Sequence, residues 1–497
     1  MISAALRGRM LLASTSVRRA LAALGCVFVL ALPRSAECAE PTSRDVPGPD
    51  VIFIVLDTWR FDHLGINTGR AGLTPNLDAF ARDSIRFTRT ISPSNVTSYA
   101  MVGVMSSFSP RITLGRLPEE MDSLSELLRR AGYATIGVSA NPNVSREFGH
   151  AQGFDVFLDP TDQPVFLVTS LLQLFGEFLP GLAYASGSID AGLYYRPFSE
   201  VRGRGVRLFE RSPRPAFLYL HTMDLHGPYL PPKAYLPSDF ALADFYSYHR
   251  FNDLSGKGVL GSPAFARHLR NLKQRYEAGA RYSDAEFGRL VQELGAAGRW
   301  DESLVWVLSD HGESFGEHDY AGHGGNNVTT TLIQVPLLLK LPRSWGAPAR
   351  VESTPVSTLD LLPTTLGLLG LAPPARIFGR DWSNLMPQQG SSTLVSYAAA
   401  YRAGDGAVTE IYSAIDWPWK LDLRMPRRGT ALRSLFHLEQ DPGEDMDLAV
   451  RRPEIVTRLE EEVRLWRERE RRIQLSSEPA PIDPRVQEQL RELGYVE

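Results

Sequence analysis

Residues 51–65 have the sequence VIFIVLDTWRFDHLG, and this stretch decides the fold class. The run Val51 to Leu56 is short, apolar and rich in β-branched residues, which is typical of a strand buried on both faces. A strand of that kind needs helices on both sides of its sheet. The strand ends at Asp57, whose carboxylate is costly to bury unless it meets a cation or hydrogen-bond donors. Asp57 alone also fits an ordinary helix N-cap.

Four further short apolar runs have the same character, and helical patterns separate them. They are Thr135 to Ser139, Ala216 to Leu220, Ser303 to Leu308 and Val335 to Lys340. We therefore predict an α/β fold whose central, mostly parallel sheet is sandwiched by helices. Ligands of such sheets bind outside the carboxyl ends of the strands. Here those ends carry Asp57, Asn141, His221 and the pair Asp310-His311, which we expect to converge.

A dense polar segment follows one of these strands. Residues 309–318 read SDHGESFGEH, and His323 lies shortly after them. Carboxylates and imidazoles packed so closely at a strand end indicate a functional site. This segment favours a site role for Asp57 over a capping role.

Composition excludes several classes of protein. The chain has 497 residues, 43% of them hydrophobic, so it can bury a large core. Its 53 Lys and Arg against 57 Asp and Glu give a formal charge of −4, which argues against a nucleic-acid partner. The cysteines are Cys26 and Cys38, so the folded body offers no cysteine ligand or nucleophile.

The first 39 residues have the pattern of an export signal. Several arginines precede the apolar run Ala20 to Leu32, and small residues follow near Ala36 and Ala39. Glu37 departs from the usual cleavage pattern, so an uncleaved anchor is the alternative. We expect an exported protein, periplasmic or secreted, or one associated with the membrane through this segment.

Two domains are expected after the signal, over residues 50–390 and 391–497. The second reads as a smaller α+β subdomain, with short strands near Tyr412 to Ile415 and Trp419 to Leu423 and a helix from Pro453. Phe166 to Leu182 is apolar on several faces of a predicted helix. We interpret that helix as core packing rather than as a surface for lipid or an acyl chain.

The chain resembles the sulfatases of the alkaline phosphatase superfamily over almost its whole mature length. The matching stretches are Val51 to Gly65, Thr74 to Asp78, Phe87 to Pro110, Gly132 to Thr135, Gln152 to Asp155, His221 to Tyr229, Ser309 to Gly324, Asp360 to Thr364, Asp441 to Glu444 and Leu493 to Tyr495. The resemblance implies an alkaline-phosphatase-like α/β domain that binds a divalent metal and a smaller C-terminal domain.

The resemblance also implies the metal ligands. Carried over by position, Asp57, Asp310 and His311 would bind the ion. An oxygen-rich donor set with one imidazole suits a hard or borderline dication, so we expect Ca²⁺, with Mn²⁺ or Zn²⁺ as alternatives.

Substrate contacts follow from the same resemblance. His226 and His323 would contact the anionic substrate or the leaving oxygen. For His226 the alternative is a buried imidazole bonded to the backbone. We assign further substrate contacts to His221, Asn141 and His318.

The departure from the family lies at the nucleophile. The sulfatases carry Cys/Ser-x-Pro-x-Arg, the signal for oxidation to formylglycine, where this chain has Thr97-Ser98-Tyr99-Ala100-Met101. We therefore expect no formylglycine. Thr58 also replaces the second Asp expected after Asp57.

A threonine at this position still fits catalysis. The nucleotide phosphodiesterases and phosphoethanolamine transferases of the superfamily use a metal-bound Thr, and the spacing from Asp310-His311 to His323 looks like that of the transferases. The resemblance thus implies a hydrolase or transferase of sulfate, phosphate or phosphonate esters in which Thr97 binds the metal and attacks. The substrate would be a small molecule or a glycan or lipid ester. Two alternatives remain: Thr97 as a helix N-cap, and an inactive protein of this fold that binds anionic glycans or lipids.

Overall fold

The computed structural model describes residues 48–70, 72–160, 195–236, 238, 257–263, 265–325, 327–384, 393–401 and 408–473. The predicted export signal and the predicted helix Phe166 to Leu182 lie outside these residues. Within the described part of the chain, no helix combines the length and hydropathy of a membrane span.

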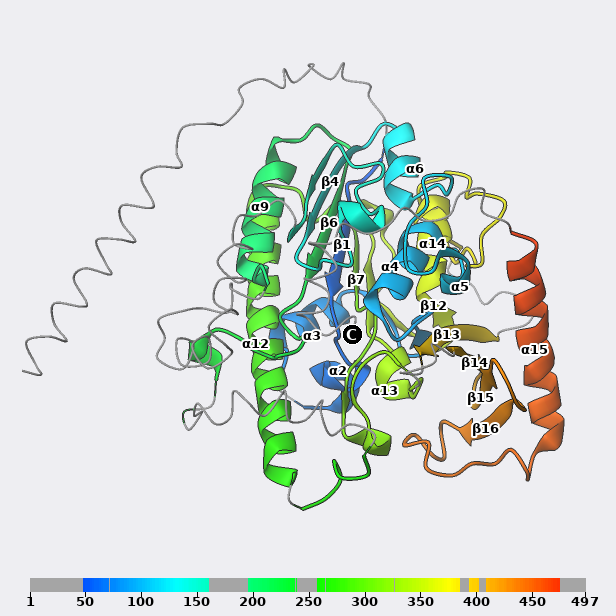
Figure 1. Ribbon diagram of the computed structural model, residues 1–497. Helices are drawn as coiled ribbons and strands as arrows, with labels where there is room; N and C mark the ends of the chain where they lie inside the picture. The colour runs from blue at the N-terminus through cyan, green and yellow to red at the C-terminus, as the bar shows by residue number, and fades with distance from the viewer. Residues whose placement is uncertain are drawn as a thin grey trace, which may run out of the picture. The chain divides into compact units, whose positions relative to one another are not determined.

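An eight-stranded sheet forms the centre of the main domain (Figure 1). Its order is β11 (Arg350–Glu352), β2 (Ile85–Phe87), β10 (Leu337–Lys340), β7 (Leu304–Leu308), β1 (Val51–Leu56), β6 (Ala216–Thr222), β4 (Ala134–Ser139) and β5 (Val156–Leu158). β10 runs antiparallel to both of its neighbours, and the other pairs are parallel. The predicted mostly parallel α/β sheet is confirmed.

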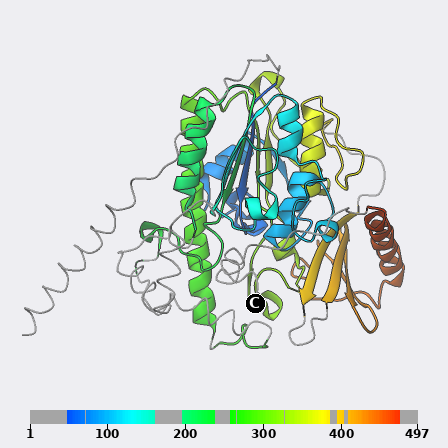
Figure 2. The same ribbon diagram turned by 45° about the horizontal axis from the view of Figure 1, so that its top comes forward.

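Helices cover both faces of this sheet, as Figure 2 shows. One face packs against α3 (Pro75–Arg82), α9 (Phe198–Arg211) and α12 (Ala266–Ala296), and the other against α4 (Thr97–Ser106), α6 (Leu124–Arg130) and α14 (Leu361–Leu368). Side chains of β1 alternate between the two cores, with Ile52 and Ile54 in the first and Val51 and Phe53 in the second. Both sets are fully buried, which explains the unbroken apolar run.

Short elements connect these layers. They are η1 (Phe61–His63), α2 (Gly65–Thr68), β3 (Thr90–Ile91), α5 (Pro110–Thr113), η2 (Arg146–Phe148), η5 (Lys233–Tyr235), β8 (Ser314–Phe315), η6 (Glu317–Asp319), β9 (Ala321–Gly322), α13 (Thr330–Ile333), η7 (Arg343–Trp345), β12 (Val356–Ser357) and η8 (Thr358–Asp360).

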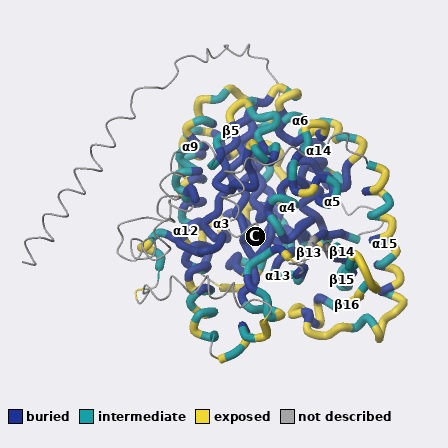
Figure 3. Tube along the Cα trace, in the orientation of Figure 1, coloured by how far each residue is buried: buried dark blue, intermediate teal, exposed yellow. Residues whose placement is uncertain are grey.

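The C-terminal part contains a four-stranded antiparallel sheet and one long helix. The strands are β13 (Leu394–Tyr401), β14 (Val408–Asp416), β15 (Trp419–Pro426) and β16 (Leu432–His437) in that order, and the helix is α15 (Pro453–Arg471). Val456, Leu459 and Val463 of α15 pack on the sheet, while much of the opposite side of the helix is exposed (Figure 3). The expected α+β architecture is present. The predicted boundary near residue 390 falls among residues that are not described.

A buried ionic cluster includes Glu444, the last residue of the turn Asp441 to Glu444. Lys420 has no exposed surface, and its Nζ donates to Asp422 at 2.9 Å and to Glu444 at 2.5 Å. Glu444 also accepts from the backbone N–H of Thr330 in α13 at 2.6 Å. This turn therefore joins the C-terminal sheet to the main domain.

Candidate metal and active site

The predicted strand ends converge. β1 lies between β6 and β7 in the sheet, and β4 lies on the far side of β6. The N–H of Asp57 donates to the carbonyl of Thr222 at the end of β6 (3.1 Å). Asp57, Asn141, His221 and Asp310 are buried together at this edge of the sheet. The expected convergence of polar residues is confirmed.

Among the described residues, only one oxygen of Asp57 has hydrogen-bond partners. Its Oδ2 accepts from Nδ2 of Asn141 (2.5 Å) and lies 2.8 Å from Nε2 of His221. Its Oδ1 is buried without a hydrogen-bond partner. Burial raises the pKa of Asp57, but the hydrogen bond and charge of His221, with those of His226 and His311, lower it well below its usual range.

His221 has a different role from the expected substrate contact. Its ring is fully buried, with Nε2 against Asp57 and Nδ1 2.8 Å from the hydroxyl of Tyr219. Both nitrogens are therefore used within the protein, and His221 orients the Asp57 carboxylate. The amide of Asn141 acts on the same oxygen.

Asp310 is arranged in the same way. Its Oδ1 accepts from the backbone N–H groups of Thr58 (3.0 Å) and His311 (2.9 Å), whereas Oδ2 is buried without a hydrogen-bond partner among the described residues and lies 3.4 Å from Nε2 of His311. The Thr58 hydroxyl donates to the carbonyl of Asp57 (2.8 Å). The backbone N–H of Thr58 thus positions the Asp310 carboxylate. The Thr58 side chain bonds to the backbone carbonyl of Asp57 and adds no carboxylate ligand.

The hydroxyl of Thr97 lies 3.0 Å from Nε2 of His311. Nδ1 of His311 lies 2.8 Å from the carbonyl of Gly312; because a carbonyl only accepts, Nδ1 carries a proton, and Nε2 of the neutral ring is an acceptor. Thr97 therefore donates to His311. Thr97 is the first residue of α4, Val96 is the N-cap, and no side chain caps the helix. The capping alternative for Thr97 does not hold.

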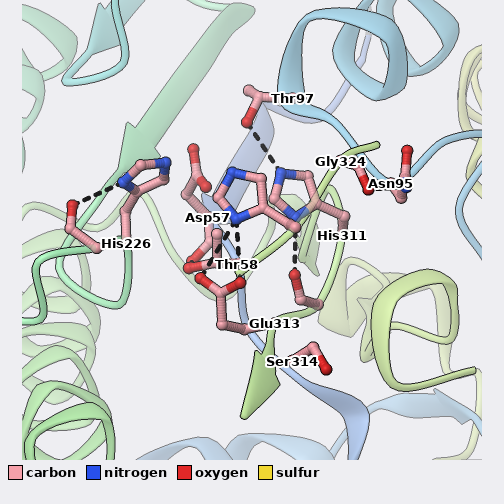
Figure 4. A network of polar contacts seen from close by, with 12 residues as sticks. Asp57, Thr58, Asn95, Thr97, His226, His311, Glu313, Ser314 and Gly324 are labelled. Carbon is pink, nitrogen blue, oxygen red and sulfur yellow. Dashed lines mark hydrogen bonds and ion pairs between the residues drawn. The ribbon is translucent and has the colours of Figure 1, made fainter. Parts of the chain in front are cut away.

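These residues fit a divalent cation. One ligand atom each from Asp57, Asp310 and His311 lies within 4.8 Å of the others, and all three residues are buried. Two buried carboxylate oxygens without hydrogen-bond partners at this separation would be costly without a cation. Figure 4 shows Thr97 pointing from α4 toward His311 beside this cluster.

Two more histidines border the cluster. The ring of His323 lies 4.4 Å from that of His311 and 5.0 Å from that of His226, measured between centroids. Nδ1 of His226 contacts the carbonyl of Gly227 (2.8 Å), as the backbone-bonded alternative requires. Burial lowers the pKa of His226, and the charge of His323 lowers it further.

Glu313 is a site residue that the sequence did not single out. Its buried carboxylate lies 3.1 Å from Nδ1 of His323. Burial lowers the pKa of His323, but the charge and hydrogen bond of Glu313 raise it above the usual value. The signal was present in the polar segment 309–318, although periodicity does not show which carboxylate meets which imidazole.

His318 is not brought to this cluster by any described contact. It is exposed, and its Nε2 lies 2.8 Å from the carbonyl of Gly443 in the C-terminal part. The expected substrate contact of His318 is therefore replaced by a contact between the loop and the C-terminal turn.

Residues 49–371, more than half of the chain, match the family model described as Sulfatase. The chain belongs to the sulfatase family. It is 26% identical over 385 residues to an ulvan-active sulfatase of Formosa agariphila, covering 73% of this chain and 70% of the relative. It is 23% identical over 398 residues to a multifunctional alkaline phosphatase superfamily protein of Trinickia caryophylli, covering 67% and 76%.

Solved structures show the same fold for this sulfatase-family chain. A phosphonate monoester hydrolase of Agrobacterium radiobacter superposes with a TM-score of 0.65 at 20% identity, covering 86% of this chain and 96% of the other. A protein solved with its substrate D-glucosamine-2-N,6-O-disulfate superposes with a TM-score of 0.66 at 15% identity, covering 85% and 98%. The family is one of sulfuric ester hydrolases, and the two superpositions, which cover most of both chains, show that the fold is shared.

Proposed function

We propose that this protein cleaves phosphate or phosphonate esters, with Thr97 as the nucleophile beside one divalent cation. The observation that carries the proposal is the 3.0 Å contact of the Thr97 hydroxyl with Nε2 of His311, a member of the Asp57, Asp310 and His311 donor set. A cation bound there would draw in the Thr97 oxygen, lower the pKa of its hydroxyl and neutralise the oxygens of the ester.

Residues of this chain take separate roles in the proposed reaction. The Thr97 hydroxyl releases its proton to solvent, and its oxygen forms a bond to phosphorus while the bond from phosphorus to the leaving oxygen breaks. The leaving oxygen takes up a proton on the side where His226 and His323 lie. Water, or an acceptor alcohol in a transferase, subsequently attacks phosphorus and returns Thr97 to its free form.

A threonine nucleophile favours phosphorus esters over sulfate esters as substrates in this scheme. An aldehyde hydrate has a second hydroxyl whose deprotonation expels sulfate from the covalent intermediate, and Thr97 has none. A phosphothreonine ester is open to in-line attack by water at phosphorus. The names of two similar proteins, the multifunctional superfamily protein and the phosphonate monoester hydrolase, support the same substrate class.

The donor set supports Mn²⁺ or Zn²⁺ ahead of the expected Ca²⁺. Ca²⁺ takes six to eight oxygen ligands, whereas imidazole suits zinc and other transition metals. Here Thr58 contributes no carboxylate, and His311 presents a nitrogen lone pair. Metal analysis of the purified protein tests this order.

Export and the nature of the ester belong to the proposal as well. We expect the N-terminal segment to direct the protein out of the cytoplasm, with a small-molecule, glycan or lipid ester as substrate. Fractionation with and without a carbonate wash separates a cleaved, released protein from an anchored one.

A turnover panel tests the function. The purified protein is loaded separately with Ca²⁺, Mn²⁺ and Zn²⁺ and assayed on aryl phosphate monoesters and diesters, aryl phosphonates and aryl sulfates. We expect turnover of the phosphorus esters with a transition metal. A sulfatase without phosphorus activity would refute the substrate class, and absence of turnover on every ester would favour a binding protein.

A further inference from the structure

We infer that Asn95 is a positioning residue that fixes His323 relative to Thr97, an inference that rests on the proposed function. Asn95 lies two residues before Thr97, and Gly324 directly follows His323. The side-chain amide of Asn95 donates to the carbonyl of Gly324 at 2.9 Å, and the N–H of Gly324 donates to the carbonyl of Asn95 at 3.0 Å. Figure 4 shows the two residues beside Thr97.

A third hydrogen bond extends this link. The same amide of Asn95 donates to the carbonyl of Asn327 at 2.6 Å. Asn95 has no exposed surface and Asn327 is only 6% exposed, so water does not substitute for these bonds. The loop that carries His323 is thus bonded on its C-terminal side to the segment that starts α4.

The backbone at this junction adopts a conformation that favours glycine. Gly324 has a φ of +83°, and a Cβ there would be in ordinary van der Waals contact, at 3.5 Å, with Cγ2 of Val96. Val96 is the extended N-cap residue between Asn95 and Thr97. Because Gly324 directly follows His323, a shift of the Gly324 backbone would move the His323 ring relative to His311 and Thr97.

Asn95 is expected to affect the rate of catalysis and not only the stability of the protein. A catalytic group displaced by about 1 Å commonly costs on the order of 100-fold in rate. We expect Asn95→Ala to lower kcat by about 10- to 100-fold on that scale, with KM and metal content close to the wild type, because Asn95 contacts none of the proposed metal ligands. Asn67→Ala is the matched control, since its amide also donates to a backbone carbonyl, that of Phe61 (3.0 Å).

A double-mutant cycle between Asn95 and His323 is the deciding test. If Asn95 acts through His323, Asn95→Ala will have little further effect on kcat in the His323→Ala background. Equal losses in both backgrounds would overturn the inference, because a general structural role adds independently. Wild-type activity of the Asn95→Ala single variant would overturn it as well.

Hydrogen exchange gives a second measurement that needs no turnover. We expect faster exchange over residues 322–328 in Asn95→Ala and unchanged exchange in α12. Unchanged exchange over residues 322–328 would show that the hydrogen bonds of Asn95 to Gly324 and Asn327 do not hold this loop, and would overturn the inference. Absence of wild-type turnover with altered exchange would instead refute the proposed function and leave the structural link between Asn95 and the loop intact.

Discussion

Nε2 of His221 lies 2.8 Å from Oδ2 of Asp57, and this contact determines which oxygen of the carboxylate stays bare. The side-chain amide of Asn141 donates to the same oxygen at 2.5 Å, so Oδ1 is the oxygen of Asp57 that can bind a cation. The carboxylate is thereby held in one orientation before any cation arrives. Outer contacts of this kind orient metal ligands and tune their affinity.

Replacing Asp57 and Asp310 together by Ala is expected to abolish metal binding, because their two bare oxygens supply most of the negative charge of the donor set. Metal content measured by mass spectrometry on the folded protein checks this. Asp284→Ala is the matched control, since Asp284 is buried but bonds to Asn76 and Leu77 instead. Unchanged metal content in the double variant would contradict the assignment.

Thr97→Ala is expected to lower esterase activity by about 10³-fold or more, the scale seen when a nucleophile is removed. Metal content should remain close to wild type, because the carboxylates and His311 are untouched. Thr97→Ser should keep partial activity through its primary hydroxyl. Ser98→Ala serves as the control. Full activity of Thr97→Ala would show that water, rather than Thr97, attacks.

No aldehyde should form at the nucleophile position. Thr97 has a secondary alcohol and lacks the thiol or primary alcohol that oxidation to formylglycine requires. Peptide mass spectrometry across Thr90 to Arg111, on protein made in cells that contain the maturation machinery, checks the expectation. An aldehyde mass on any residue of that peptide would refute it.

Asp224 should make stability fall as pH rises from about 4 to about 7. Burial raises its pKa to about 7 from 3.8, so the native state keeps a proton that the unfolded chain loses over this range. Its contribution is fully present below pH 4 and is lost as pH rises through 7, a change on the order of a few kcal/mol. Denaturant unfolding of wild type and Asp224→Asn at several pH values measures it. The difference between the two proteins should depend on pH; a constant difference would contradict the prediction.

Lys420→Met is expected to destabilise the C-terminal sheet by about 3–5 kcal/mol, because Asp422 and Glu444 would remain buried without their cation. Thermal unfolding and exchange in β14 and β15 provide the measurement. Arg433→Ala, which removes a surface pair with Glu460, should cost at most about 1 kcal/mol. Similar losses of stability in both variants would show that the buried cluster contributes no more to stability than a surface ion pair does.

Local sequence was sufficient for the central strands of the main sheet and for the C-terminal helix, whereas the short strands β2, β5 and β11 were not predicted. The apolar run Val51 to Leu56 is β1 over the same residues, and the three- and four-residue spacing after Pro453 is α15. The rule that parallel strands present their carboxyl ends at one edge placed Asp57 beside Asp310 correctly. These features depend on periodicity and on strand direction, which neighbouring residues determine.

Only the tertiary structure decided what each polar side chain does. His221 and Asn141 orient Asp57 from 164 and 84 residues away along the chain. His318 contacts Gly443 in the C-terminal part. Thr97 contacts His311, 214 residues away, and does not cap its own helix. The physical reason is that a hydrogen bond depends on ångström-scale position and on tautomer. Both are set by packing between distant segments, whereas sequence periodicity reports only which face of its own element a residue occupies.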